Sequence, residues 1–201
     1  MRTLVLSAAL AAVVSGAVIA QAPSPGPNTW TIDSNHSAAG FSVKHLMVST
    51  VRGTLGPVKG TIEWDGTSVE SIKADVSIDV SGINTGSESR DRDLKSAEGL
   101  FEIAKFPTAT FKSKRVVPSG SGTFKLVGDL TIHGVTKEVT LDVDGPSPPL
   151  KQGPNLRAGA SATATINRKD FGLTYNRMVE AAPVVSDDVK ITIDVEATKR
   201  Q

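Results

Sequence analysis

Apolar and polar residues alternate with a period of two along most of this chain. The pattern is plainest in residues 72–80, 158–166 and 189–195, and on both arms of the hairpin-like stretch 128–143. Alternation of this period places every apolar side chain on one face of an extended strand. It predicts antiparallel strands buried on one face, because parallel α/β strands are apolar on both faces.

Eight or nine such strands follow one another between Trp30 and Val195. A one-faced sheet must either pack against a second sheet or close on itself. Residues 69–80 alone would span about 40 Å at ~3.3 Å per residue, and long open edges promote aggregation. We therefore expect an all-β fold, a closed eight-stranded antiparallel barrel, in preference to a sandwich.

Two stretches interrupt the alternation. Residues 88–105 carry opposite charges four positions apart and an apolar stripe at helical spacing, and Gly99 divides the stretch into two expected short helices. Residues 171–182 also lack alternation. We expect short helical insertions near 88–105 and 171–182, of the kind that cap one end of a barrel.

The first twenty residues have the features of a secretory signal peptide. A basic start at Arg2 precedes the apolar run 4–20, and small residues precede a cut near Ala20. A transmembrane helix is the alternative, but the run is short and the proline-rich spacer 21–28 follows it at once. The expected organisation is a leader, this spacer and a single domain over residues 29–200, located in the periplasm or secreted.

Charge and cysteine content exclude several classes. The chain has 22 basic and 21 acidic residues, and loss of the leader removes only Arg2, which leaves 21 of each sign. Such a balanced chain lacks the field that nucleic acid binding requires. It has no cysteine, so an exported form has no disulfides and depends on its core alone.

The interior of the expected barrel is poor in bulky residues. The whole chain has six Phe, two Trp and one Tyr, and the expected caps take several of them. The inward row Ala158, Ala160, Ala162 and Ala164 offers only methyl groups. An eight-stranded barrel can be filled by side chains or can hold one small ligand, and the pattern leaves a filled core and a cavity equally open.

No catalytic or metal motif stands out. The three histidines, His36, His45 and His133, have no spacing typical of a zinc site. There is no G-x-S-x-G elbow and no glycine-rich phosphate loop, so we nominate no catalytic residue, metal or cofactor. Arg92 has Glu88 as a helical partner, whereas Arg90 has no acid four positions away, so Arg90 is the better candidate for a polar ligand group.

Five stretches in series resemble the YceI-like polyisoprenoid-binding family. They are "WTIDSNHSAAGFSVKHLMVSTVRGTLGPVKGTI", "GINTGSESRDRDLKSAEGLFEIAKFPTATFKS", "GDLTIHGVTKEVTLDV", "INRKDFGL" and "VSDDVKITIDVEA". The resemblance covers roughly residues 29–198. The resemblance implies a lipocalin-like barrel, exported to the periplasm, that binds an amphiphilic isoprenoid or other long-chain lipid in an elongated apolar cavity without catalysis.

The family's central motif falls on Arg90, Asp91 and Leu94, and its strand-end histidine on His45. Asp93 stands where the family usually has histidine, and Gly82 and Asn84 stand where Ser and Asp are common. An acid near the mouth weakens the case for a diphosphate head group and suits a quinone, alcohol or amide better.

These observations give a set of expected site residues. The mouth or head-group residues are His45, Arg90 and Asp91. The expected tail-cavity residues are Phe41, Val43, Val76, Ile78, Phe111, Leu141, Ala160, Ala162, Ala164, Ile191 and Ile193.

The expected function is an exported carrier or sequestering protein for an amphiphilic lipid. Its membrane contact would be transient at most, and a homodimer is left open. Two alternatives remain. One is a periplasmic enzyme that acts on a lipid in the same cavity, for which His45 is the only residue that the sequence suggests as a titratable group beside the cavity. The other is a filled barrel that binds another protein, for which the turn at residues 146–155 is the candidate contact.

Overall fold

The computed structural model describes residues 26–175, 178–179 and 182–201. The expected leader lies outside them, and all strands of the barrel fall within residues 29–200. The strands are β1 (Thr29–Ile32), β2 (Ala38–His45), β3 (Ser49–Thr54), β4 (Val58–Glu63), β5 (Lys73–Asp79), β6 (Thr108–Gly120), β7 (Thr123–Ile132), β8 (Val135–Asp144), β9 (Leu150–Gln152), β10 (Asn155–Asn167), β11 (Met178–Val179), β12 (Ala182–Pro183) and β13 (Asp188–Arg200).

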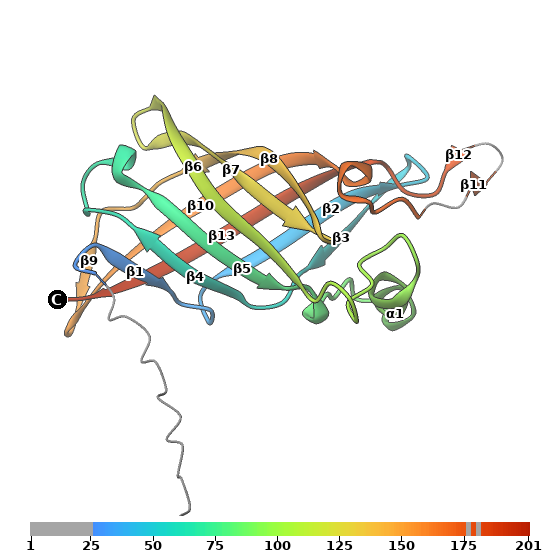
Figure 1. Ribbon diagram of the computed structural model, residues 1–201, viewed down its shortest axis with the longest axis horizontal. Coiled ribbons are helices and arrows are strands. Elements are labelled where there is room, and N and C mark those ends of the chain that lie inside the picture. Colours follow the sequence, from blue (N-terminus) through green and yellow to red (C-terminus); the bar gives the residue numbers. More distant parts are fainter. Residues whose placement is uncertain (1–25, 176–177, 180–181) are drawn as a thin grey trace, which may run out of the picture.

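The expected barrel is confirmed (Figure 1). Antiparallel neighbours run in the order β13, β1, β4, β5, β6, β7, β8 and β10, and β10 pairs again with β13 to close the circle. The closing pair is in register over thirteen residues, from Asn155 opposite Arg200 to Asn167 opposite Asp188. Closure leaves no open edge in this circuit, which is the reason for preferring a barrel to a sandwich.

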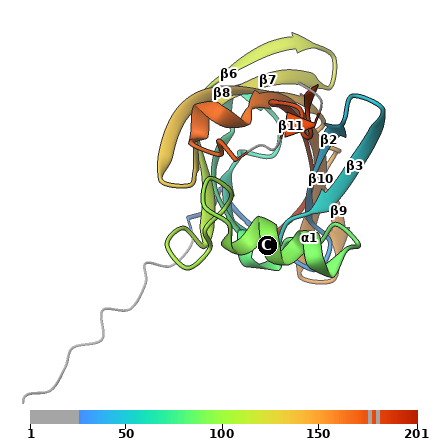
Figure 2. The same cartoon turned by 90° about the vertical axis from the view of Figure 1, so that its right-hand side faces the viewer.

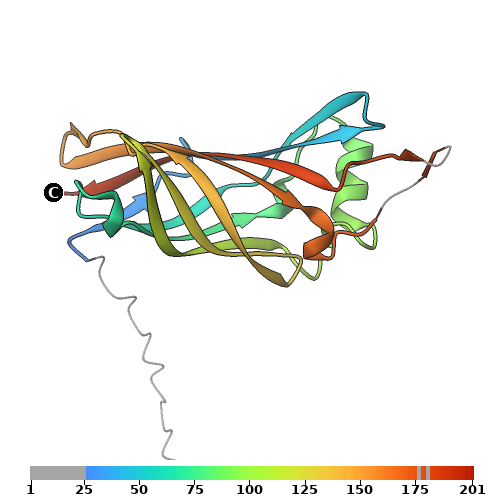
Figure 3. The ribbon, with the colours of Figure 1, turned by 90° about the horizontal axis from the view of Figure 1, so that it is seen from above.

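One side of the wall is made of two strands placed end to end. β1 pairs with the end of β13 at Thr198, and β2 pairs with its first half at Lys190–Asp194. β3 pairs only with β2 among the named strands, so the β2–β3 hairpin extends the wall at one end of the barrel. Figure 3 shows this hairpin projecting at the end that also carries α1 (Glu88–Ser96) and the β11–β12 pair.

Two tight turns at that end have both central residues in the left-handed region. The β7–β8 turn uses His133 and Gly134, with φ of 52° and 73°. The β2–β3 turn uses Leu46 and Met47, with φ of 49° and 57°, and Val48 N donates to His45 O at 3.0 Å. These are the φ signs of a type I′ turn, which normally carries Asn or Gly.

The first insertion is helical only over α1. The helix ends at Ser96, and the backbone then turns, with Gly99 at φ 74° and Glu102 at φ 44°. The second helix expected after Gly99 does not form. The carbonyl of Gly99 instead accepts from Tyr175 N at 2.9 Å, and a Cβ at Gly99 would lie 2.9 Å from that nitrogen. Gly99 therefore allows the backbone of Tyr175 to come close and does not mark a boundary between two helices.

The second insertion differs from the helix expected over residues 171–182. A 3₁₀ turn, η3 (Arg168–Phe171), ends at Gly172, and the β11–β12 pair follows. Residues 176–177 and 180–181 lie outside the described residues. The buried Arg168 guanidinium donates to the carbonyls of Leu173, Tyr175 and Ser186. Because these bonds tie both ends of the loop to one side chain, its base is held in an irregular, non-helical path.

Short 3₁₀ turns complete the described structure. They are η1 (Val69–Ser71) before β5 and η2 (Val80–Gly82) after it. The core consists of a large buried cluster, to which Trp30, Phe111 and Phe124 contribute, and a smaller one formed by Ile32, Ala39 and Val58. Among the described residues, no helix is both long enough and apolar enough to cross a membrane.

Candidate functional site

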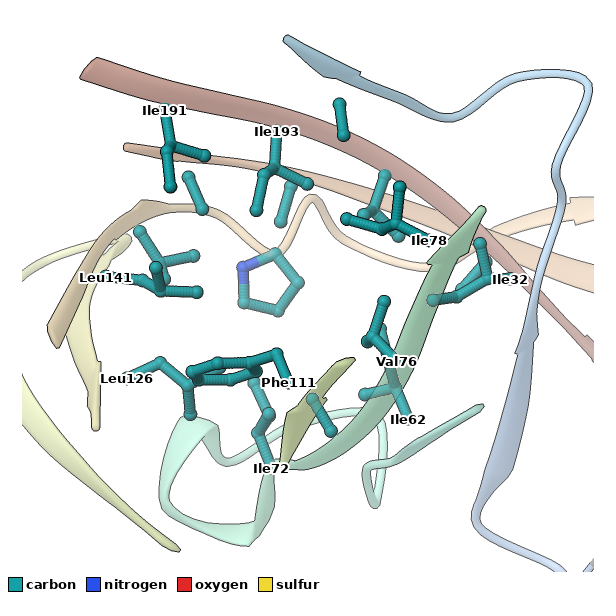
Figure 4. A pocket seen from close by; sticks show the side chains of 18 of the residues that line it. Ile32, Ile62, Ile72, Val76, Ile78, Phe111, Leu126, Leu141, Ile191 and Ile193 are labelled. Atoms are coloured by element: carbon teal, nitrogen blue, oxygen red, sulfur yellow. The ribbon is translucent and has the colours of Figure 1, made fainter. Parts of the chain in front are cut away.

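The barrel encloses an apolar cavity (Figure 4). The space open to the centre of a water molecule is about 160 Å³. The labelled side chains from β4, β5, β6, β7, β8 and β13 point into a common space in Figure 4. Apart from Thr110 and the indoles of Trp30 and Trp64, the lining residues carry no polar side-chain atom. The interior is therefore hollow, apolar and free of charged side chains over the part of the chain that is described.

Small side chains on β10 and β13 make room for this cavity. Ala158 lies opposite Ala197 in the register, and Ala160 lies opposite Val195. Since short side chains face each other along this seam, the wall stays thin while bulky residues such as Phe111 line the far side. From Ile191 to Ala197 the lined stretch advances by six residue steps, or about 20 Å at ~3.3 Å per residue. The cavity suits a slender, extended apolar molecule.

Eight of the eleven expected cavity residues line this space: Val76, Ile78, Phe111, Leu141, Ala160, Ala162, Ile191 and Ile193. Phe41, Val43 and Ala164 do not. The ring of Phe41 lies over Gly53, where an added Cβ would be 2.6 Å from its Cζ. Val43 pairs with Val51 at the extended end of the wall. Ala164 is buried in the core cluster but not on the cavity surface.

Several lining residues were absent from the expected set. Trp30, Ile62 and Leu126 have the inward parity of their strands, and Trp64 and Ile72 continue that alternation just after β4 and just before β5, so the alternation contained the signal. Pro146 and Leu55 lie between strands, where no periodicity applies, and only the folded chain brings them to the cavity.

Two tryptophans mark the end of the cavity nearest the C-terminus. Their ring centroids are 5.1 Å apart, and Trp30 Nε1 donates to the backbone carbonyl of Trp64 at 3.0 Å. The Lys199 ammonium lies 5.0 Å from the centre of the Trp30 ring, an arrangement in which a cation is attracted to the ring face. Trp64 Nε1 is buried and has no hydrogen-bond partner among the described residues.

Apolar residues from outside the barrel strands cover the opposite end. Phe171 and Leu173 are buried, and Phe101 and Ile103 pack against the same core cluster. Figure 2 looks along the barrel from this end and shows α1 lying across part of the rim. The two insertions therefore sit together as a cap.

The three expected mouth residues do not line the cavity. Arg90 donates from Nε to Thr85 Oγ1 at 2.7 Å and from Nη2 to the Thr85 carbonyl at 2.8 Å. Asp91 accepts from Thr85 N and from its hydroxyl, and the hydroxyl bond chiefly holds the pKa of Asp91 below its ordinary value. This pair fastens α1 to the loop after η2. His45, half-buried, lies at the end of β2 and bridges to Val185.

One group of side chains has the composition of a metal site. Donor atoms of Asp33, His36 and Glu196 lie within 4.8 Å of one another. However, the Arg157 guanidinium pairs with both carboxylates. Hydrogen bonds from His36, from the backbone of Asn35 and from Arg157 hold the pKa of Asp33 at about 2. Because a cationic side chain already neutralises the acids, these residues form an ion-pair network rather than a vacant metal-binding set.

A second carboxylate–histidine pair lies near the cap. Glu102 Oε2 is 2.9 Å from His133 Nε2, and Lys105 Nζ is 2.7 Å from Glu102 Oε1. The Lys105 bond, followed by the His133 bond, lowers the pKa of Glu102 to about 2. Neither residue lines the cavity. The edge of the Phe106 ring contacts His133, so the pair fastens the cap to the β7–β8 turn.

A family model described as the YceI-like domain matches residues 30–197. The chain belongs to the YceI-like family. UPF0312 protein SA2479 of Staphylococcus aureus (strain N315) is 38% identical over 170 residues, which are 83% of this chain and 95% of that protein. Among solved structures, a Campylobacter jejuni YCEI protein is 30% identical with a TM-score of 0.66, covering 79% of this chain and 90% of that one.

Two further solved structures are similar to this chain in fold alone. Burkholderia cenocepacia BcnA gives a TM-score of 0.69 at 22% identity, over 82% of this chain and 98% of BcnA. A polyisoprenoid binding domain from Saccharophagus degradans, implicated in plant cell wall breakdown, gives 0.60 at 19% identity, over 84% and 97%. The resemblance read from the five sequence motifs is thereby confirmed at the level of family and fold.

Proposed function

We propose that this YceI-like barrel is an exported binding protein that holds the tail of an amphiphilic isoprenoid or other long-chain lipid in its cavity, as a carrier or a sequestering protein. The proposal depends chiefly on the cavity, which is hollow and lined almost wholly by apolar side chains. The polyisoprenoid binding domain of Saccharophagus degradans shares the fold, which supports a lipid as the guest.

The energetics favour an apolar guest. An unfilled core void costs about 24 cal/mol per Å³, so a cavity of about 160 Å³ leaves about 4 kcal/mol to be recovered by filling it. Apolar voids of about 150 Å³ stay dry and accept small hydrocarbons. A longer tail gains about 25 cal/mol for each Å² removed from water, less the cost of ordering it. Together these terms support binding driven by the hydrophobic effect.

The absence of titratable groups supports binding over catalysis. General acid–base and nucleophilic catalysis need a polar side chain within hydrogen-bond reach of the reacting atom. No acid, base or nucleophile other than the Thr110 hydroxyl belongs to the described cavity wall. His45, the residue expected to serve an enzyme in the same cavity, is not part of that wall.

Native mass spectrometry of the protein purified from its own host tests the proposal. We expect a mass above that of the chain, released as a lipid on collisional activation. The lipid-free protein should also take up geranylgeraniol, a twenty-carbon isoprenoid alcohol, added from ethanol. Purification without any adduct, together with failure to load geranylgeraniol or a fatty amide, would overturn it.

A further inference from the structure

The β2–β3 turn exposes apolar side chains at the capped end of the barrel. Leu46, Met47 and Val48 are 37%, 63% and 86% exposed. They succeed one another along the chain at the point where the hairpin projects (Figures 1 and 3). Of the other large hydrophobic residues exposed in the described chain, Tyr175 belongs to the cap, while Val117 and Leu150 lie on β6 and β9.

The backbone of this turn is also strained. Leu46 and Met47 both have positive φ, a conformation that Gly, Asn and Asp adopt readily and that branched or bulky residues avoid. The same turn geometry at Gly134 uses a glycine. An Asn-Gly pair at residues 46–47 would remove the strain and two of the three exposed apolar side chains together, so the present residues are unfavourable for the free protein on two counts. Strain of this kind collects at functional positions.

Charge points to the surface that these residues contact. From Ser34 to Ile62 the sequence contains no Asp or Glu, while Lys44 and Arg52 flank the turn. Both are exposed on the outer face of the hairpin, where Lys44 pairs with Thr50 and Arg52 with Ser42. Neither forms an ion pair with the described residues. An apolar tip between unpaired cations matches a membrane interface, where apolar groups enter the headgroup layer and cations meet anionic lipids.

We propose that residues 46–48, here called the docking tip, insert into the headgroup layer of an anionic lipid bilayer, with Lys44 and Arg52 on the lipid phosphates. A protein partner fits less well, because a stable interface needs about 800 Å² on each side and a single turn offers far less. Docking brings the capped end of the barrel to the membrane. Its use in lipid transfer rests on the proposed function, but the binding itself does not.

Vesicle co-sedimentation of residues 21–201, which contain every barrel strand, tests the tip without the apolar leader. We expect binding to vesicles of equal phosphatidylglycerol and phosphatidylcholine, and binding at least about tenfold weaker to phosphatidylcholine alone. The variant Leu46→Asn/Met47→Gly/Val48→Ser should bind the mixed vesicles at least about tenfold more weakly while its Tm stays equal or rises. Leu150→Ser, which changes an exposed leucine on β9, is the matched control and should bind normally.

Three results would overturn the proposal. They are no binding of the unaltered protein to the mixed vesicles, full binding by the triple variant, and a dimer in sedimentation velocity that the triple variant abolishes without any vesicle binding. Loading of geranylgeraniol from ethanol separates this proposal from the preceding one. If loading fails while vesicle binding persists, the lipid-carrier function falls and the docking tip stands.

Discussion

Trp30 Nε1 donates a hydrogen bond to the backbone carbonyl of Trp64, 34 residues further along the chain, at a distance of 3.0 Å. The bond joins β1 to the residue that follows β4 and fixes the Trp30 ring, which is 1% exposed, against the ring of Trp64. The reciprocal group, Trp64 Nε1, is buried without a partner among the described residues. The two indoles are equal in size and close in burial, but only the Trp30 N–H group has a hydrogen-bond acceptor among the described residues.

This asymmetry predicts different costs for the same substitution. Trp30→Phe removes a donor and leaves the Trp64 carbonyl unpaired, whereas Trp64→Phe removes a donor that has no partner. Both lose the same volume, so the difference reports the polar groups: a hydrogen bond lost in one variant and a buried, unpaired donor removed in the other, together worth about 1–2 kcal/mol. Urea unfolding should show Trp30→Phe to be less stable than Trp64→Phe by that amount. Equal stability of the two variants would show that the bond contributes nothing.

Filling the cavity from its thin wall should block loading. Ala162 lines the cavity opposite Ile193, and Ala162→Trp would place an indole in the space. We expect this variant to lose geranylgeraniol uptake. It should also lose the rise in Tm that binding produces; at a ligand concentration 100 times Kd, binding stabilises the folded protein by about 2.7 kcal/mol. Thr163→Trp, exposed on the outer face of the same strand, is the control and should load normally. Normal loading by Ala162→Trp would remove Ala162 from the binding surface.

Arg168 should be a major contributor to the stability of the cap. Its guanidinium donates to Tyr175 O at 2.9 Å, to Ser186 O at 3.1 Å and to Asp187 Oδ1 at 3.0 Å. Arg168→Met keeps much of the volume but removes the donor from two part-buried carbonyls and from the buried carbonyl of Leu173, at a cost of about 2–4 kcal/mol. The exposed neighbour Lys169, which also pairs with Asp187, provides the comparison, and Lys169→Met should cost about 0.5 kcal/mol. Chemical denaturation of both variants measures the contrast.

Glu102 should make stability depend on acid pH. Its pKa is lowered from 4.5 to about 2, so the folded state favours the ionised form. The stabilisation is complete above the unfolded value near 4.5 and is lost as pH falls toward 2. Glu102→Gln should therefore be less stable than the parent protein at pH 6, with the gap closing between pH 4.5 and 2. A gap that stays constant with pH would mean that Glu102 acts through packing alone.

Much of the barrel wall was predictable because strand periodicity is a local property. Val76, Phe111 and Ile191 follow from alternation alone, and all three line the cavity. Phe41 shares their parity, yet its ring covers Gly53. Alternation gives the face of a strand and carries no information about position along the barrel axis, so it cannot distinguish the cavity from the rim.

The expected mouth depended on the family motif and, for Arg90, on charge pattern, and charge pattern carries still less spatial information. Arg90 has no acid four positions away in either direction, and this favoured it over Arg92 as a partner for a polar ligand group. In the fold, Arg90 donates hydrogen bonds to the side-chain hydroxyl and to the backbone carbonyl of Thr85, a residue in the preceding loop. Hydrogen bonds to backbone carbonyls leave no trace in a sequence pattern. The same reason hid the role of Arg168, whose main partners are also carbonyls.

The strand that seals the barrel is the last one to be made. β13 pairs with β10 along its whole length and also receives β1 and β2 on its other edge. Because synthesis proceeds from the N-terminus, a chain emerging from the ribosome has three strands with exposed hydrogen-bonding edges until residue 200 is complete. Closure of the native cylinder therefore waits until β13 has been synthesised, however many of the earlier strands have already paired.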